Sequence, residues 1–260
     1  MIGHWEYLGR TKTGPAVLVV EETKLGRAMS VLHISLHQDG LLSKAPWVSP
    51  DSRREVTAYI TNCDLTKENG VSLPTNWTVS PAPPPVNFSL LLNGQDPYWQ
   101  RYVLLPIMNM VPIIHHVEFY YPRTGRPSLA DHDLWMRLAN GEKFKQTDLG
   151  FIVDASAPFI VEGYRREDPD MSEPEESDSI TLQSFWYPTL TLNLDVKKRL
   201  PQAGSEWLRL RQTTKQIRHG RLDLEFLVFD TAGELVAISH HVAMAVDSAR
   251  NYAARKPSKI

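Results

Sequence analysis

The chain has 260 residues and a mass of 29.6 kDa, which suits one large or two modest domains with a sizeable buried core. Its 28 Lys and Arg residues nearly balance its 30 Asp and Glu residues, so the charge does not indicate a nucleic-acid-binding protein. A single cysteine, Cys63, excludes a disulfide framework and a multi-cysteine zinc site. No apolar run reaches the ~20 residues that a membrane-spanning helix needs.

The N-terminal part predicts an antiparallel hairpin and a third strand. Residues 16–20 are β-rich, residues 24–27 form a turn, and residues 30–37 form the second strand. Apolar and polar side chains then alternate over residues 54–60, as in a half-buried strand.

The middle of the chain has a different amino-acid composition. Prolines concentrate between residues 74 and 85 and recur up to residue 127, so we expect an extended interdomain segment over residues 71–131. The acidic stretch from Glu167 to Asp178 predicts a solvated loop.

The C-terminal part repeats the plan of the N-terminal part. Strands are predicted over residues 134–138, 207–211, 222–228 and 235–246, with turns at residues 219–221 and 231–233. Both parts run long strand, Gly-Arg turn, long strand, Gly turn, strand. A duplicated unit accounts for this order, although similar hairpins can also arise by chance.

One helix is predicted in this strand-rich chain. Thr147 is the expected N-cap, an apolar face carries Leu149 and Val153, and Pro158 should end or kink the helix. Asp154 lies within this apolar stretch. Burial would raise its pKa toward that of a general base, whereas an exposed helical aspartate would have no such role; the periodicity allows both.

The sequence lacks the motifs of several common enzyme classes. The sequence has neither the Gly-x-Ser-x-Gly elbow of serine hydrolases nor a Gly-rich phosphate loop. The pairs 115–116 and 240–241 are adjacent histidines, and neighbours on a strand point to opposite faces, so neither pair predicts a metal site. An aspartate, a hydroxyl and an imidazole remain, which together could activate water.

Longer motifs then resemble a known family. Residues 187–195 with 198–201, residues 204–208 and residues 230–237 resemble strands of the thioesterase-like superfamily, which comprises double-hotdog enzymes related to type II acyl-CoA thioesterase. Residues 5–10 with 14–16 resemble the matching strand of the first hotdog, and residues 75–78 and 141–144 resemble fungal members. The resemblance implies an α+β fold in which antiparallel sheets each wrap a central helix.

The resemblance also implies a site. By motif position, the family's aspartate falls on Asp154, its threonine on Thr189, and its glutamine on His241. Asp154 would activate water, with Thr189 and His241 completing a hydrogen-bond cradle and backbone N–H groups stabilising the oxyanion. Histidine in the glutamine position titrates near neutrality when unperturbed, so it could alter the pH dependence or the chemistry.

A second departure concerns the first half. In the family, a strand and the central helix precede the region of Trp5, and the sequence here has no residues for them. We therefore expect an incomplete N-terminal hotdog over residues 1–70, the interdomain segment over 71–131 and a C-terminal hotdog over 132–260. An uncovered apolar sheet face needs a partner element, and a homo-oligomer could supply one.

The resemblance implies an acyl-CoA hydrolase, with acyl-CoA or a related acyl thioester as partner and with no cofactor or metal. Two alternatives stay open: a biosynthetic enzyme acting on a polyketide-like or carrier-bound acyl group, and a non-catalytic acyl-binding protein. The terminal residues Ser258, Lys259 and Ile260 are close to the Ser-Lys-Leu peroxisomal address, so we expect a peroxisomal location, with the cytoplasm as the alternative.

Overall fold

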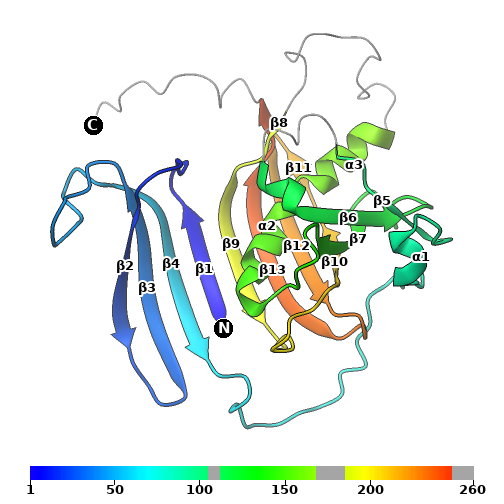
Figure 1. Cartoon of the computed structure of the whole chain (residues 1–260), viewed down its shortest axis with the longest axis horizontal. Coiled ribbons are helices and arrows are strands. Elements are labelled where there is room, and N and C mark those ends of the chain that lie inside the picture. The colour runs from blue at the N-terminus through cyan, green and yellow to red at the C-terminus, as the bar shows by residue number, and fades with distance from the viewer. Residues whose placement is uncertain (105–111, 168–184, 248–260) are drawn as a thin grey trace.

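The computed structural model describes residues 1–104, 112–167 and 185–247. Its main element is a twelve-stranded antiparallel sheet in the order β2-β3-β4-β1-β9-β13-β12-β10-β7-β6-β5, with β11 beside β12 (Figure 1). The first half of the chain forms β1 (Ile2–Tyr7), β2 (Val17–Lys24), β3 (Met29–Gln38) and β4 (Arg53–Cys63). The second half forms β5 (Trp99–Arg101), β6 (Val117–Pro122), β7 (Asp131–Leu138), β9 (Thr189–Val196), β10 (Leu208–Thr213), β11 (Ile217–Arg218), β12 (Arg221–Phe229) and β13 (Leu235–Met244). The short strands β8 (Phe185–Trp186) and β14 (Val246–Asp247) pair with each other.

The two halves join edge to edge. β1 pairs antiparallel with β9, from Ile2 opposite Asp195 to Glu6 opposite Thr191. On either side of this seam the order is the same, because β4, β3 and β2 follow β1 as β13, β12 and β10 follow β9. The predicted strands and the N-terminal hairpin are confirmed, and the matching order supports a duplicated unit.

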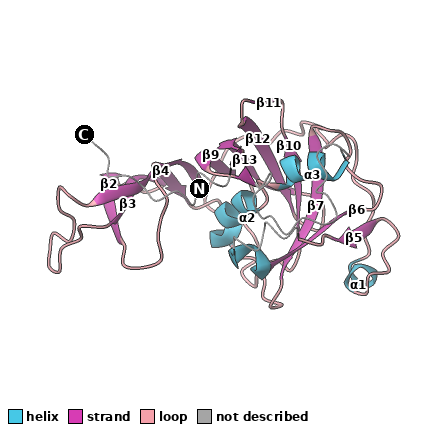
Figure 2. Ribbon diagram, turned by 90° about the horizontal axis from the view of Figure 1, so that it is seen from above, coloured by secondary structure: helices cyan, strands magenta, loops and turns pink. Residues whose placement is uncertain are grey.

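In the second half the sheet curves around the helices α2 (Leu149–Ala155) and α3 (Phe159–Glu167), as Figure 2 shows. Residues of α2 and α3 and the inward faces of the strands form one buried cluster, whose members all lie at or beyond residue 102. A sheet that wraps a central helix is the arrangement expected of a hotdog. The α+β prediction is therefore confirmed in the second half.

The central helix is interrupted where the sequence predicts. α2 ends at Ala155 and α3 begins at Phe159, because Pro158 cannot donate the backbone hydrogen bond that a continuous helix requires. The predicted N-cap was wrong. Thr147 lies inside a 3-10 turn (Gln146–Asp148), and the Asp148 carboxylate accepts the hydrogen bond from the Lys145 N–H at 2.8 Å.

The first half has no such helix. Residues 1–87 are all described, and the regular elements they form are four strands, of which β2, β3 and β4 extend away from the helices in Figure 2. On the face continuous with the helix-covered one, Leu18 is 63% and Val20 53% exposed. The expectation that the first half lacks a central helix is confirmed.

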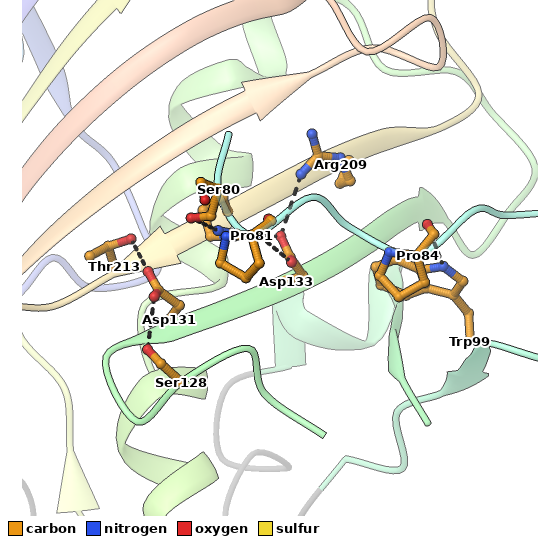
Figure 3. A network of polar contacts seen from close by, with 10 residues as sticks. Ser80, Pro81, Pro84, Trp99, Ser128, Asp131, Asp133, Arg209 and Thr213 are labelled. Carbon is orange, nitrogen blue, oxygen red and sulfur yellow. Dashed lines mark hydrogen bonds and ion pairs between the residues drawn. The ribbon is translucent and has the colours of Figure 1, made fainter. Parts of the chain in front are cut away.

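The proline-rich segment is docked on the second half. The Arg211 guanidinium donates hydrogen bonds to the carbonyl oxygens of Ser80 (3.2 Å) and Pro81 (2.8 Å), and to both oxygens of the buried Asp133 carboxylate. Figure 3 shows Ser80 and Pro81 next to Asp133. Farther along, the Trp99 indole N–H lies 3.2 Å from the Pro85 carbonyl oxygen. Proline lacks an N–H but keeps its carbonyl, so donors from the sheet can hold the segment in place.

The predicted boundary at residue 131 does not coincide with a break in the sheet. β5 and β6 lie within residues 71–131 and extend the second-half sheet next to β7. The helix α1 (Phe88–Leu92) and the 3-10 helix Pro112–His116 also lie in this segment. Most of the acidic stretch up to Asp178 and the terminal Ser258–Ile260 tripeptide lie outside the described residues, so the peroxisomal address stays a prediction.

Within the described residues, none of the helices is both long and apolar enough to cross a bilayer.

Candidate functional site

The structure joins two of the three residues named from the sequence. Asp154 is in the last turn of α2, and Thr189 is the first residue of β9. The Thr189 hydroxyl donates a 2.7 Å hydrogen bond to Oδ1 of Asp154 across 35 positions of sequence. Because a serine or threonine hydroxyl has one proton, this bond leaves Oδ2 of Asp154 as the oxygen available to another donor.

The surroundings of Asp154 favour its protonated form. Its backbone follows the fully buried Ile152 and Val153, and removal of water from the carboxylate raises its pKa. The bond from Thr189 acts in the opposite direction, because it stabilises the charged form, and it is the smaller effect. A carboxylate with a raised pKa is a stronger base than an ordinary aspartate.

His241 lies on the same face of the sheet as Thr189. It pairs with Leu192, and two positions later Ala243 pairs with Thr189, so alternation directs both side chains toward the helix. The His241 side chain is 2% exposed and packs on Phe226, with ring centroids 4.7 Å apart. In the described part of the chain, no hydrogen bond joins His241 directly to Asp154 or Thr189.

A neighbouring serine assigns the tautomer of His241. The Ser239 hydroxyl donates to the carbonyl oxygen of Asn193, which can only accept, at 2.5 Å. The same hydroxyl lies 2.9 Å from Nε2 of His241, so it must accept there, and Nε2 carries the proton. The other ring nitrogen, Nδ1, is then a buried acceptor, and it has no partner in the described structure.

Burial also keeps His241 neutral. Desolvation, with a smaller contribution from the neighbouring His240, lowers the pKa of His241 to about 3. Burial therefore removes the titration near neutrality that an unperturbed histidine in this position would have. At physiological pH this imidazole offers one fixed donor and one fixed acceptor, as a glutamine amide offers donors and an acceptor.

Sequence reasoning placed Ser239 on the last strand beside the two histidines, but it did not predict the contact of Ser239 with the ring of His241. Ser239 lies two positions before His241, and this spacing puts both side chains on one face of a strand. That spacing is the signal that could have identified it.

The part of the chain that the structure describes has no candidate metal site. Among the described residues, no three His, Cys, Asp or Glu side chains are grouped so that they could hold a metal ion. A depression lined by His4, Tyr59, Asn193 and His240 lies on the opposite face of the sheet. It does not belong to the Asp154 site, because these side chains alternate with the inward ones.

Comparison with known proteins gives the family. The Acyl-CoA thioesterase C-terminal domain model matches residues 89–245, and the Acyl-CoA thioesterase N-terminal domain model matches residues 3–63. The chain belongs to the acyl-CoA thioesterase family. Thioesterase-like protein TwmA of Talaromyces wortmannii is 40% identical over 271 residues, which cover 96% of this chain and 78% of that protein.

Solved structures agree with the fold. A hotdog-fold protein of unknown function from Alicyclobacillus acidocaldarius superposes with a TM-score of 0.66 at 15% identity, covering 94% of this chain and 78% of that one. Acyl-CoA thioesterase II from Mycobacterium marinum has a TM-score of 0.55 at 15% identity, covering 95% and 80%. The two family models, the similar solved structures and the strand order of the sheet together show the double-hotdog fold of this chain.

Proposed function

We propose that this thioesterase family member hydrolyses acyl thioesters, acyl-CoA among them, with Asp154 as the general base. The observation that carries the proposal is the carboxylate of Asp154, whose pKa burial raises and whose Oδ1 is held by Thr189. Asp154 is a better base than His241, because the pKa of His241 is only about 3.

In the proposed reaction, a water molecule donates one hydrogen bond to Oδ2 of Asp154 and one to Nδ1 of His241. Its lone pair then faces the thioester carbonyl carbon. As the water oxygen bonds to that carbon, Asp154 takes a proton, and a tetrahedral intermediate forms. The C–S bond then breaks, and the proton passes from Asp154 to the leaving thiolate, so the products are a carboxylic acid and a thiol.

Thr189 and His241 act on the base and the water in this scheme. The bond from Thr189 holds the carboxylate in one orientation, which lowers the entropy cost of reaching the reactive geometry. The fixed tautomer of His241 supplies an acceptor only at Nδ1, so water there must donate rather than accept. The Thr189 hydroxyl carries no charge, and His241 stays neutral between pH 5 and pH 8 because its pKa is about 3. The group whose ionisation the reaction depends on is Asp154.

The test is hydrolysis of a panel of acyl-CoA chain lengths and of acyl-N-acetylcysteamine thioesters, which stand in for carrier-bound groups. We expect Asp154→Asn to lower kcat about 100- to 10,000-fold, because asparagine keeps the shape and the acceptor for Thr189 but cannot take a proton. Asp195→Asn, on the outward face of the same strand β9, is the matched control and should keep full activity.

Retained turnover in Asp154→Asn would reassign the base. Turnover of the N-acetylcysteamine thioesters alone would favour the biosynthetic alternative. Binding of acyl-CoA without hydrolysis of any substrate by the unmodified protein would contradict the hydrolase proposal and favour acyl binding.

A further inference from the structure

Tyr7 of the first half lies beside the Asp154 site of the second half. Along the seam, Trp5 pairs with Leu192 and Glu6 with Thr191. Leu192 is buried among the residues that cover α2, so Trp5 and, two positions later, Tyr7 lie on that same inward face. Tyr7 ends β1 at the end of the seam where β9 begins with Thr189.

Two contacts support this placement. The Tyr7 ring packs on the buried cluster that contains Ile152 and Val153 of α2. Just beyond β1, the guanidinium carbon of Arg10 lies 5.8 Å from the ring centroid of Trp186, which closely precedes Thr189. The end of β1 and the start of β9 are therefore neighbours, and the two strands lie side by side in Figure 1.

The carboxylate of Asp154 is close enough to Tyr7 to affect the pKa of its hydroxyl. Burial raises the pKa of Tyr7 well above its usual value, and the nearby negative carboxylate of Asp154 raises it further. The phenol therefore keeps its proton at every physiological pH. In the described structure its hydroxyl makes no hydrogen bond to another residue, so a donor without a protein acceptor lies near the base.

We propose that Tyr7 is a catalytic residue whose hydroxyl donates a hydrogen bond to the thioester carbonyl oxygen. The inference rests on the proposed function. In the proposed reaction the attacking water lies between Asp154 and the carbonyl carbon, so the carbonyl oxygen is one bond farther from the carboxylate, and a hydroxyl close to Asp154 can reach it. A neutral donor in a site with little water stabilises the negative charge that develops on this oxygen. The first half of the chain thereby completes the site of the second half.

The first test is Tyr7→Phe, which keeps the ring and its packing. We expect kcat to fall about 100- to 1,000-fold with little change in KM and no shift in the pH profile, because the lost bond is made mainly in the transition state. Tyr59→Phe is the matched control, since Tyr59 is 56% exposed on β4 and pairs with His4 on the outward face. It should keep full activity.

A second readout is independent of turnover. A 2-oxoalkyl thioether of CoA keeps the carbonyl but has no bond to hydrolyse, and a hydrogen bond lowers the infrared stretching frequency of its ¹³C-labelled carbonyl. We expect the lowered frequency in the unmodified protein and in Asp154→Asn, and loss of the shift in Tyr7→Phe.

The outcomes separate the two proposals. If acyl-CoA is hydrolysed but Tyr7→Phe matches the unmodified protein in kcat and in carbonyl frequency, the role of Tyr7 is wrong and the hydrolase proposal stands. If no thioester is hydrolysed but the frequency shift depends on Tyr7, the donor role stands and the hydrolase proposal fails. A pH profile displaced by Tyr7→Phe, with the carbonyl frequency unchanged, would instead make Tyr7 a positioning residue for Asp154 and overturn the inference.

Discussion

At the scale of single residues, burial changes what the side chains of this site can do. An aspartate and a histidine would both be charged or half-charged near neutrality if they were exposed. Here desolvation raises the pKa of Asp154 and lowers that of His241 to about 3, so one group can take a proton and the other cannot. Each shift also links the stability of the fold to pH.

His241→Gln should flatten the acid limb of the stability curve. In the native state His241 stays neutral down to about pH 3, whereas in the unfolded chain it takes a proton near pH 6.5. The unfolded state therefore binds more protons in this window, and stability falls as the pH falls. Urea unfolding at pH 7, 6, 5 and 4 should show the unmodified protein losing up to about 1.4 kcal/mol per pH unit relative to the variant. Parallel curves would contradict the buried, neutral histidine, and His240→Gln is the exposed control.

Asp154→Asn should show the opposite sign. The raised pKa means that native Asp154 binds its proton at pH values where the unfolded chain has lost it, so ionisation costs stability as the pH rises. Asparagine cannot ionise and can still accept from Thr189. Thermal unfolding at pH 8 should therefore give a Tm for the variant equal to or a few degrees above that of the unmodified protein, with no advantage near pH 3. A lower Tm at pH 8 would show that the carboxylate is stabilised in the fold.

At the scale of elements, the proline-rich segment predicted to be a linker is packed against the second-half sheet. The part of this segment before β5 forms no strand, and side chains of the second-half sheet donate hydrogen bonds to its carbonyl oxygens. Asp133 is fully buried and is neutralised by Arg211, with Arg209 3.4 Å away. An ion pair in such a place is sensitive to the loss of one partner.

Arg211→Met should destabilise the protein by about 3–5 kcal/mol, because it leaves the buried Asp133 carboxylate with Arg209 alone as a cationic partner and releases the Ser80 and Pro81 carbonyls. Limited proteolysis should then cut within residues 71–87 at concentrations that leave the unmodified protein intact. The control is Lys215→Met, whose ammonium is exposed and lies 3.8–3.9 Å from its acidic partners, and which should change stability by less than about 1 kcal/mol. Unchanged proteolysis in Arg211→Met would contradict the docking of this segment.

At the scale of the whole molecule, the two halves share one sheet but not one core. The large buried cluster lies entirely in the second half, and the inward face of β2 is exposed at Leu18 and Val20. Buried apolar contacts set how much free energy a local opening costs. The continuous hydrogen-bond ladder across the seam therefore joins regions of unequal stability.

Hydrogen exchange should reveal this difference. We expect amides of β2 and β3 to exchange at least about tenfold faster than those of β12 and β13, which are buried against α2 and α3. Mass spectrometry of deuterated peptides measures both pairs in one experiment, and the matching positions in the two halves serve as each other's control. Equal protection of the two hairpins would show that the inward face of the first half is covered in solution.

The features that could be predicted from the amino-acid pattern are local. Alternation predicted the strands, proline predicted the break between α2 and α3, and an aspartate in an apolar helix identified the candidate base, because these patterns depend on neighbours a few positions away. The motif resemblance supplied Thr189 and His241. Sequence reasoning placed the N-cap incorrectly at Thr147, since the competing carboxylate of Asp148 caps the turn instead.

How these groups interact depends on the folded chain. The bond from Thr189 to Asp154, the proton on Nε2 of His241 and the proximity of Tyr7 each depend on residues that are distant in sequence and become adjacent when β1, β9 and β13 pair. The pKa shifts likewise arise from burial, which no local pattern specifies. Strand pairing and desolvation are properties of the assembled sheet, so the chemistry of this site could be read only from the fold.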